Sequence, residues 1–322
     1  MEPILSICIP TYNRCDALKK SLNRYVNCDG FDESVEIVIS DNASTDDTEL
    51  IAKSFCDNYN NIKYYRNNQN ICDSNFELAL KRGTGKYLKL QNDTTLYDKN
   101  ALVYLKKCIQ ISDEKIPIFF TNDFIYTKYK GQEVINCDSF ENYIESVSTF
   151  VTAISCFGVW KKQLRDIKDF TKYTKLMLNQ DDWSYQLLEK YNSCVIYNKH
   201  YYDGLPKKSG GYHWFEVHLD NYYKIMQPYI IKGLISKETL EKDKKNLLKH
   251  FIPELKYIYV YPISRWEFGK KGTFRILWKY YKYNWYFYLL LFIYPFSLII
   301  LNVLHYSKCI MKFIYKRLKN VK

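Results

Sequence analysis

The 322-residue sequence lacks the short motifs that mark several common classes of functional site. Its ten cysteines include no Cys-x-x-Cys pair, and its five histidines form no cluster at metal-ligand spacing. It has no Gly-rich loop with a basic residue near its beginning, which is the feature expected of a site that grips a triphosphate. It also contains no internal repeat and no low-complexity linker, so an array of modules is not indicated.

A basic stretch is missing before the first apolar segment, because Met1, Glu2 and Pro3 lead directly into it. We therefore expect no secretory signal peptide and a reducing compartment in which the cysteines are free thiols. Cys8 lies in this first apolar segment, where a small buried core residue is expected rather than a nucleophile.

Short segments rich in Ile and Val alternate with helical patterns over the first hundred residues. Strands are expected at 4–10, 35–41, 62–66 and 87–91, and helices at about 15–26, 46–59 and 73–82. Strands that alternate with helices of this length predict βαβ units and a mostly parallel sheet, which is an α/β fold.

The later part of the chain shows a weaker pattern. A helix is expected at about 99–111, a strand at 116–120 with 124–128 as its hairpin partner or neighbour, a helix at 183–190 and a strand at 195–197. After residue 222 the pattern becomes helical. We therefore expect one compact domain over residues 1–225 and a helical extension over residues 226–322.

Polar side chains follow the first two expected strands where each strand ends. The first strand runs into Pro10, Thr11, Tyr12 and Asn13, and the second strand ends at Asp41. Ligands of open parallel sheets bind outside the carboxyl ends of the strands. The Asp41 carboxylate can accept a hydrogen bond from uracil N3–H or from ribose hydroxyls, or it can cap the turn before the next helix.

These two loops resemble the start of a family-2 glycosyltransferase of the GT-A type. The family has an apolar strand into Pro-Thr-Tyr-Asn-Arg and a second strand into Asp-Asn-x-Ser-x-Asp, and both occur here at the usual separation. Further matches follow in order at 67–71, 83–87, 92–93 and 181–183. The resemblance covers roughly residues 3–225 and implies a Rossmann-like GT-A sheet. Within the family, the segment 209–212 resembles the corresponding segment of the branch that builds bacterial surface polysaccharides.

The resemblance implies a nucleotide-sugar site. Its residues would be Pro10, Thr11, Tyr12, Asn13, Asp41, Asn70, Asn92 and Asp93. Family members usually carry two acids at the position of Asn92 and Asp93, which hold a divalent cation, Mg²⁺ or Mn²⁺, against the donor diphosphate. Here Asp93 is the single acid, so less charge would hold the cation. A plain polar turn is the alternative for Asp93. His213 is a further candidate metal ligand, and ordinary packing is its alternative.

The resemblance places the catalytic base in the acid pair Asp181 and Asp182, just before an expected helix. An inverting transfer needs one general base, which takes a proton from the acceptor hydroxyl as that hydroxyl attacks the anomeric carbon. The second acid is usually the base, so Asp182 is favoured over Asp181. Adjacent carboxylates repel, which should raise the pKa of one of them. Helix capping is the alternative role, and capping is compatible with catalysis.

The basic residues are concentrated at the end of the chain. Residues 256–322 carry thirteen Lys and Arg against one acid, Glu267, and so account for the whole net charge of +12. Basic residues at helical spacing in 271–282 and 308–319 flank the uncharged stretch 285–306, which is long enough to cross a bilayer. A membrane span, a re-entrant hairpin and a buried soluble helix are all compatible with this stretch.

Basic flanks on both sides of the uncharged stretch, and Pro295 within it, favour attachment to one leaflet. Together with the family resemblance, this tail implies an inverting glycosyltransferase at the cytoplasmic face of the cell membrane. It would move a sugar from a nucleoside diphosphate, with UDP favoured, to a lipid-linked saccharide. A degenerate nucleotide-binding protein and a sugar nucleotidyltransferase are the alternatives. Nucleic-acid binding through the basic tail is disfavoured by the apolar block.

Overall fold

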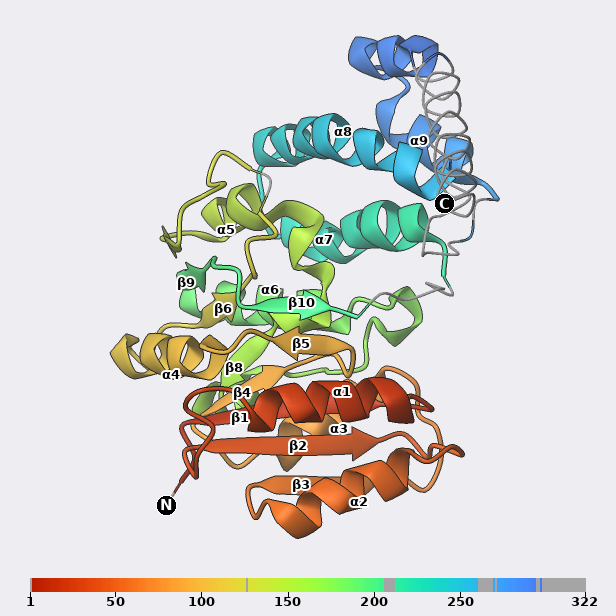
Figure 1. The fold of residues 1–322 in the computed structure, drawn as a ribbon. Helices are drawn as coiled ribbons and strands as arrows, with labels where there is room; N and C mark the ends of the chain where they lie inside the picture. Colours follow the sequence, from red (N-terminus) through yellow and green to blue (C-terminus); the bar gives the residue numbers. More distant parts are fainter. Residues whose placement is uncertain are drawn as a thin grey trace, which may run out of the picture. The chain divides into compact units, whose positions relative to one another are not determined.

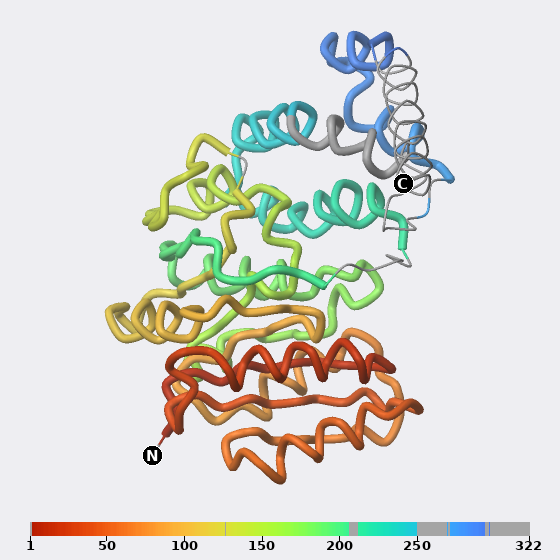
Figure 2. Tube along the Cα trace, in the orientation of Figure 1, coloured from red at the N-terminus to blue at the C-terminus, as the bar shows by residue number. Residues whose placement is uncertain are grey.

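The computed structural model describes residues 2–125, 127–205, 212–259, 269, 271–293 and 296. Figures 1 and 2 draw the course of the chain. Its internal contacts divide it into two compact units. The first unit comprises Met1–Leu205 with Asn221–Asp243, and the second comprises Pro206–Asp220 with Lys244–Lys322. The boundary expected between residues 225 and 226 lies inside α7 (Tyr222–Ile231), which is part of the first unit. The domain division drawn from the sequence stays a prediction.

A five-stranded sheet in the order β3-β2-β1-β4-β8 forms the centre of the first unit. Its strands are β1 (Leu5–Thr11), β2 (Val35–Asp41), β3 (Ile62–Arg66), β4 (Tyr87–Leu90) and β8 (Gly158–Trp160). The first four are parallel, and β8 runs antiparallel to β4. The expected α/β fold with a mostly parallel sheet is therefore confirmed. Because Thr11 lies opposite Asp41, the first two strands end at the same edge.

Helices cover both faces of this sheet. They are α1 (Cys15–Val26), α2 (Thr48–Asn58) and α3 (Ser74–Arg82). Figure 1 shows α1 and α2 side by side in front of the sheet and α3 behind it. Every residue of β1 and β2 is buried, which explains why their sequences are mostly apolar.

Two smaller sheets complete the strands of the first unit. One has the order β6-β9-β7 and contains β6 (Ile118–Phe120), β9 (Cys194–Tyr197) and β7 (Val134–Cys137). The other is an antiparallel ribbon of β5 (Thr95–Tyr97) and β10 (Tyr202–Gly204), and beyond it the Leu205 N–H donates to the Thr94 carbonyl at 2.8 Å. The helix α4 (Ala101–Ile111) follows β5 in the chain.

The prediction that residues 124–128 form the strand that pairs with 116–120 is wrong. Residues 124, 125, 127 and 128 form no strand, and β6 pairs in parallel with β9 instead. The chain leaves β6 through Asn122 and Asp123, whose φ angles are 51° and 58°. Asn and Asp tolerate this left-handed conformation, and two successive residues in it end the strand.

The remaining helices lie later in the chain. They are α5 (Phe140–Val147), α6 (Asn179–Tyr191), α7, α8 (Lys237–Tyr259) and α9 (Thr273–Tyr281), and residues 285–293 are also helical. Short 3-10 turns include η2 (Ile154–Cys156). Within the described ranges, no helix is long and apolar enough to cross a membrane. Of the expected uncharged stretch 285–306, residues 294, 295 and 297–306 lie outside the described residues, as does the basic set at 308–319.

Candidate functional site

The loops that follow β1 and β2 are bonded to each other. Asn13 has a φ of 50°, and its backbone N–H donates to Ser44 Oγ at 2.9 Å. The Thr45 N–H donates to Asn13 Oδ1 at 2.7 Å, and the Asn42 N–H donates to the Thr11 carbonyl at 2.9 Å. The two loops identified from the sequence therefore form one surface at the edge of the sheet.

Asp41 is fully buried at the end of β2. Its carboxylate accepts hydrogen bonds from the Ser44 backbone N–H at 2.9 Å and from the Ser44 hydroxyl at 2.5 Å. It also accepts from Tyr64 Oη at 2.7 Å and from the Arg66 guanidinium at 3.0 Å. Burial and the Asp41 contact raise the pKa of Tyr64, so its hydroxyl stays a donor. In this state Asp41 holds the turn, and its contact with a nucleotide stays a prediction.

Asp93 ties the end of β4 to the loop after β1. Its Oδ2 accepts from the Thr11 hydroxyl at 2.9 Å, and its Oδ1 accepts from the Arg14 guanidinium at 3.0 Å. The Asp93 carbonyl accepts from the Ser21 hydroxyl on α1 at 2.8 Å. The backbone N–H of neighbouring Asn92 donates to Ser155 Oγ at 3.2 Å. The structure thus joins Thr11, Asn92 and Asp93 in one cluster.

Asn70 is linked to the same edge through an amide network. The Asn42 side chain donates to Asn70 Oδ1 at 2.8 Å, and Asn42 Oδ1 accepts from Asn67 at 3.1 Å. Asn67 also donates to Asn75 Oδ1 at 2.9 Å. Pro10 is buried within β1, whereas Tyr12 is exposed. The amides therefore fix the loop after β3 against the loop after β2.

A divalent cation fits Asp93 in donor chemistry, since carboxylate oxygens suit hard cations and Mg²⁺ commonly takes only one or two carboxylates besides phosphates. The Arg14 guanidinium now holds one of the two oxygens, so it would have to yield to the cation. His213 belongs to the second unit, where its Nδ1 accepts from the Glu216 N–H at 3.1 Å and its Nε2 lies 3.2 Å from Thr273 Oγ1. Metal ligation by His213 stays a prediction.

Asp181 and Asp182 lie in the first turn of α6, and each is only 1% exposed. Asp182 Oδ1 accepts from Tyr229 Oη at 2.9 Å, and Oδ2 accepts from Gln186 Nε2 at 2.7 Å. Among the described residues, Asp181 Oδ2 has no hydrogen-bond partner. The helix begins earlier than expected and its N-cap residue is Leu178, so neither aspartate occupies the capping position.

Burial sets the protonation of the acid pair. It raises the pKa of Asp181 well above the ordinary carboxyl value, and the charge of Asp182 raises it further. Burial also raises the pKa of Asp182, while the hydrogen bonds from Gln186 and Tyr229 and the charge of Lys172 lower it. The environment therefore favours a neutral Asp181 beside a more readily ionised Asp182.

The turn η2 is bonded to the Asp93 loop through Ser155, and its Cys156 interacts electrostatically with both Lys89 and Asp181. The ammonium of Lys89, which is fully buried on β4, donates to the Ser155 carbonyl. Burial lowers the pKa of Lys89 to about 7. Burial raises the pKa of the Cys156 thiol to about 12, with a lowering contribution from Lys89 and a raising one from Asp181. Within the described ranges no hydrogen bond joins the acid pair directly to Asp93.

A comparison with protein-family models identifies the family of this chain. The model of glycosyl transferase family 2 matches residues 6–177, which include both loops after β1 and β2, Asp93 and η2. The chain belongs to glycosyl transferase family 2.

Curated relatives in this family come from bacteria. The abequosyltransferase RfbV of Salmonella typhimurium is 39% identical over 105 residues, which are 32% of this chain and 32% of the relative. The GalNAc(5)-diNAcBac-PP-undecaprenol beta-1,3-glucosyltransferase of Campylobacter jejuni is 28% identical over 177 residues, 53% of this chain and 55% of that protein. The chain thus matches about a third to a half of the length of these relatives.

Two solved structures share the fold at low sequence identity. S. aureus TarS 1-349 in complex with UDP has a TM-score of 0.52 and 17% identity, covering 81% of this chain and 76% of that one. Mannosyltransferase PcManGT from Pyrobaculum calidifontis, in complex with GDP-Man and Mn2+, has a TM-score of 0.51 and 12% identity, covering 79% and 72%. These likenesses, together with the sheet order, establish a GT-A fold.

Three side chains of the candidate site were not anticipated from the sequence. Lys89 was detectable, because a lysine inside an apolar parallel strand is unusual. Gln186 follows Asp182 by one helical turn, so an i,i+4 contact was foreseeable. Tyr229 had no sequence signal, since it lies on α7, beyond both the family match and the expected catalytic domain.

A cluster of exposed metal-type ligands also lies away from the expected residues. His200 Nε2 is 3.9 Å from Asp98 and 3.5 Å from Asp203, and their ligand atoms all lie within 4.8 Å of one another. The pairing of β5 with β10 brings these residues together across a hundred positions, so no local spacing marked them. Exposed groups of this kind also form ordinary ion pairs, with no metal.

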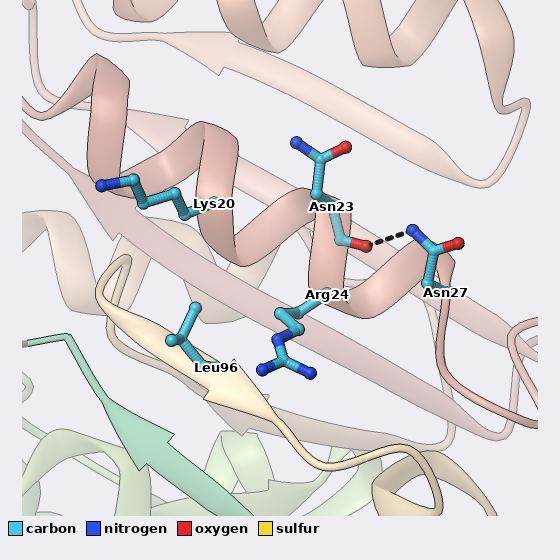
Figure 3. A pocket seen from close by; sticks show the side chains of 5 residues that line it. All are labelled: Lys20, Asn23, Arg24, Asn27 and Leu96. Carbon is cyan, nitrogen blue, oxygen red and sulfur yellow. Dashed lines mark hydrogen bonds between the residues drawn. The ribbon is translucent and has the colours of Figure 1, made fainter.

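A hollow of about 460 Å³ lies between α1 and β5. Its lining residues are Lys20, Asn23, Arg24, Asn27 and Leu96. Figure 3 shows Lys20, Asn23 and Arg24 on α1, Asn27 just past its end and Leu96 on β5. The Asn27 amide donates to the Asn23 carbonyl at 2.7 Å. None of the site residues expected from the sequence lines this hollow.

Proposed function

We propose that this family-2 protein transfers a sugar from a nucleoside diphosphate donor, of UDP type, to a saccharide acceptor in bacterial surface polysaccharide synthesis. The observation that carries the proposal is the bonded set of loops at the ends of β1, β2 and β4, which gathers Thr11, Asn13, Asp41 and Asp93 at one sheet edge. Crevices at the carboxyl ends of parallel strands are where open α/β sheets bind nucleotides.

The donor diphosphate is placed at Asp93 in this proposal. A divalent cation held by the Asp93 carboxylate would neutralise the diphosphate charge, and Arg14 beside it offers a second positive group. The solved structures of like fold include one with UDP and one with GDP-Man and Mn2+, which supports a nucleotide-sugar donor with a cation. Asp41 would read the nucleotide after Arg66, a half-exposed side chain, moves aside.

The acid pair supplies the base in this proposal. Asp182 takes the proton of the acceptor hydroxyl as the hydroxyl oxygen forms a bond to the anomeric carbon and the nucleoside diphosphate leaves from the opposite face. Each Asp182 oxygen accepts one hydrogen bond and therefore keeps a lone pair for the acceptor. Its raised pKa strengthens it as a base at neutral pH. One displacement without a covalent intermediate inverts the anomeric configuration.

The acceptor is a lipid-linked saccharide in this proposal, with the protein attached to the cytoplasmic face of the cell membrane. The name of the Campylobacter relative includes a PP-undecaprenol acceptor, which supports this class of substrate. The second unit presents large apolar side chains to solvent, among them Phe274, Trp278 and Trp285, which are 57%, 41% and 74% exposed. Aromatic side chains beside Lys and Arg suit an anionic membrane surface.

A nucleotide-binding protein without transferase activity is the second candidate. It is favoured by the state of the two donor-side acids, because Arg14 holds Asp93 and Asp41 is enclosed by its partners. Measured sugar transfer separates this candidate from the first.

The proposed base is tested with Asp182→Asn and Asp181→Asn. Asp182→Asn should lower the transfer rate by ~10² or more, the contribution expected of a general base, while nucleotide affinity stays unchanged. Asp181→Asn should keep most of the rate, because an amide mimics a neutral carboxyl group in size. Asp166→Asn is the control, because this partly buried aspartate accepts a hydrogen bond from Tyr191 at the end of α6, away from the acid pair. A rate above a tenth of wild type in Asp182→Asn would exclude this base.

A further inference from the structure

Asp182 is held from two separate elements of the first unit. Gln186, one turn further along α6, donates to Oδ2, and Tyr229 from α7 donates to Oδ1 at 2.9 Å. The Gln186 side chain is itself fixed, since its Oε1 accepts from the Lys168 N–H at 2.8 Å. Both oxygens of one carboxylate are therefore directed by donors that have little freedom to move.

Tyr229 is well supported in this position. Its ring lies 5.3 Å from the rings of both Phe140 and Tyr185, and the ammonium of Lys232 lies 5.5 Å from its ring centre. Tyr229 is 3% exposed, so its hydroxyl would lose a hydrogen bond without the aspartate. The aromatic packing holds the ring, and the ring then holds the hydroxyl toward Asp182.

We propose that Tyr229 is a positioning residue that orients the Asp182 carboxylate for proton transfer, with Gln186 fixing the second oxygen. This inference rests on the proposed function, in which Asp182 is the base. It assigns part of the catalytic arrangement to α7, which lies outside residues 6–177 of the family match. A general base must meet the acceptor hydroxyl at hydrogen-bond distance, so a free carboxylate would lose rate even with its charge intact.

The same hydrogen bond sets the pH at which the base ionises. A donor to the charged carboxylate favours that form, so Tyr229 and Gln186 lower the pKa of Asp182 against the opposing effect of burial. Removing the Tyr229 hydroxyl should therefore raise this pKa. Among the described residues, the other titratable groups around Asp182 and Tyr229 include Asp169, Lys172, Tyr173, Asp181, Tyr185, Glu189 and Lys232. They are unchanged in the variants below.

Tyr229→Phe tests the inference, because it keeps the packed ring and removes one oxygen. We expect kcat to fall roughly tenfold with the acceptor KM little changed, since the positioning acts on proton transfer. We also expect the acid limb of kcat/KM to move to higher pH, so that the deficit is largest at low pH. Tyr223→Phe is the matched control on the same helix: its hydroxyl donates to Asp243 Oδ2 at 2.9 Å, away from the acid pair.

The outcomes separate the two proposals. If Asp182→Asn abolishes transfer but the pH–rate profile of Tyr229→Phe overlays that of Tyr223→Phe, the positioning role is wrong and the base stands. If Asp182→Asn leaves transfer intact, the base itself is wrong. Thermal unfolding of both tyrosine variants checks the fold, and a lower rate with an unshifted acid limb would show only a structural role for Tyr229.

Discussion

The aspartates of the candidate site are all buried, but their partners give them different freedom. Asp41 is enclosed by the Ser44 hydroxyl, the Tyr64 phenol and the Arg66 guanidinium. Asp93 pairs with the long, exposed side chain of Arg14. Asp182 is held by two neutral donors. A neutral donor orients a carboxylate without supplying a competing positive charge, which suits a base. A carboxylate that pairs with a cationic side chain can exchange that partner for a metal cation, because both form charge-assisted contacts with its oxygens.

The exchange of cations at Asp93 gives a direct prediction. EDTA should lower sugar transfer and Mn²⁺ should restore it, since the cation would bridge Asp93 and the donor diphosphate. Asp93→Asn should raise the Mn²⁺ concentration needed for half-maximal rate. Arg14→Gln should lower that concentration, because the competing guanidinium at 3.0 Å is gone. Transfer that persists unchanged in EDTA would contradict the proposal and leave Arg14 as the group that meets the diphosphate.

The convergence of site residues was predictable, whereas their partners were not. Thr11 and Asp41 each end a parallel strand, so strand pairing alone brings them to one edge. The contact of Asp41 with Arg66 depends on a side chain of β3, and the contact of Asp182 with Tyr229 depends on how α7 packs. Side-chain partners across 25 and 47 residues follow from tertiary packing, which local sequence patterns do not specify.

At the scale of elements, β4 is unusual for an interior strand because it contains a buried lysine. Its four residues are buried, and Lys89 brings an amine into the core beside the rings of Phe120 and Tyr201, whose centres lie 5.6 and 5.7 Å away. The amine donates to η2, so the strand holds the turn that also receives the Asn92 N–H. The ring faces and one carbonyl only partly replace water around a charged amine.

The buried amine should make stability depend on pH. The folded pKa of Lys89, about 7, lies below the ordinary value of 10.5, so between these values the unfolded chain binds more protons. The free energy of unfolding should therefore rise with pH from 7 to 10 through this group, by about 1 kcal/mol per pH unit. Below pH 7 both states are protonated and the contribution becomes constant.

Urea unfolding of wild type and Lys89→Met across pH 7–10 measures this effect. The variant should lack the rise, although its stability at any one pH also reflects the lost bond to Ser155. Lys86→Met, at an exposed lysine before the same strand, should give a curve parallel to wild type. Parallel curves for all three proteins would show that Lys89 is not buried as a neutral amine.

The elements themselves were largely predictable where apolar periodicity was strong. α1 has the expected bounds, and β2 and β3 match the expected strands. The pattern failed after β6, because the left-handed pair Asn122 and Asp123 turns the chain and Asn122 Oδ1 accepts from the Tyr201 N–H at 2.8 Å. Turn chemistry that relies on a distant backbone is invisible to a local window.

At the scale of the whole molecule, the second unit combines most of the net positive charge with large exposed apolar side chains. On α9, Leu277 and Tyr281 are buried whereas Trp278 is exposed. Trp278 lies against the rings of Phe274 and Tyr288, with centres 5.7 and 6.1 Å apart. An exposed aromatic group beside basic residues is the arrangement expected of an interfacial helix.

Vesicle binding tests this surface. The double change Phe274→Ser with Trp278→Ser should release the protein from anionic vesicles, because it removes the apolar groups that would enter the interface. Leu50→Ser is the control, because Leu50 on α2 is an apolar residue that is even more exposed. Lys271→Gln with Arg275→Gln should weaken binding by roughly 1 kcal/mol per charge and reduce its salt dependence. If the full-length chain does not bind anionic vesicles, the membrane proposal is wrong.

The bonds between the loops after β1 and β2 have a thermodynamic consequence for any ligand of that edge. Fixing a backbone residue costs roughly 1–2 kcal/mol of conformational entropy, and loops that order only on binding subtract that cost from affinity. Here Asn13, Ser44 and Thr45 are already tied together before a ligand arrives. Folding has therefore ordered the receiving surface in advance, and a donor should meet it as a rigid template, with little loss of chain entropy.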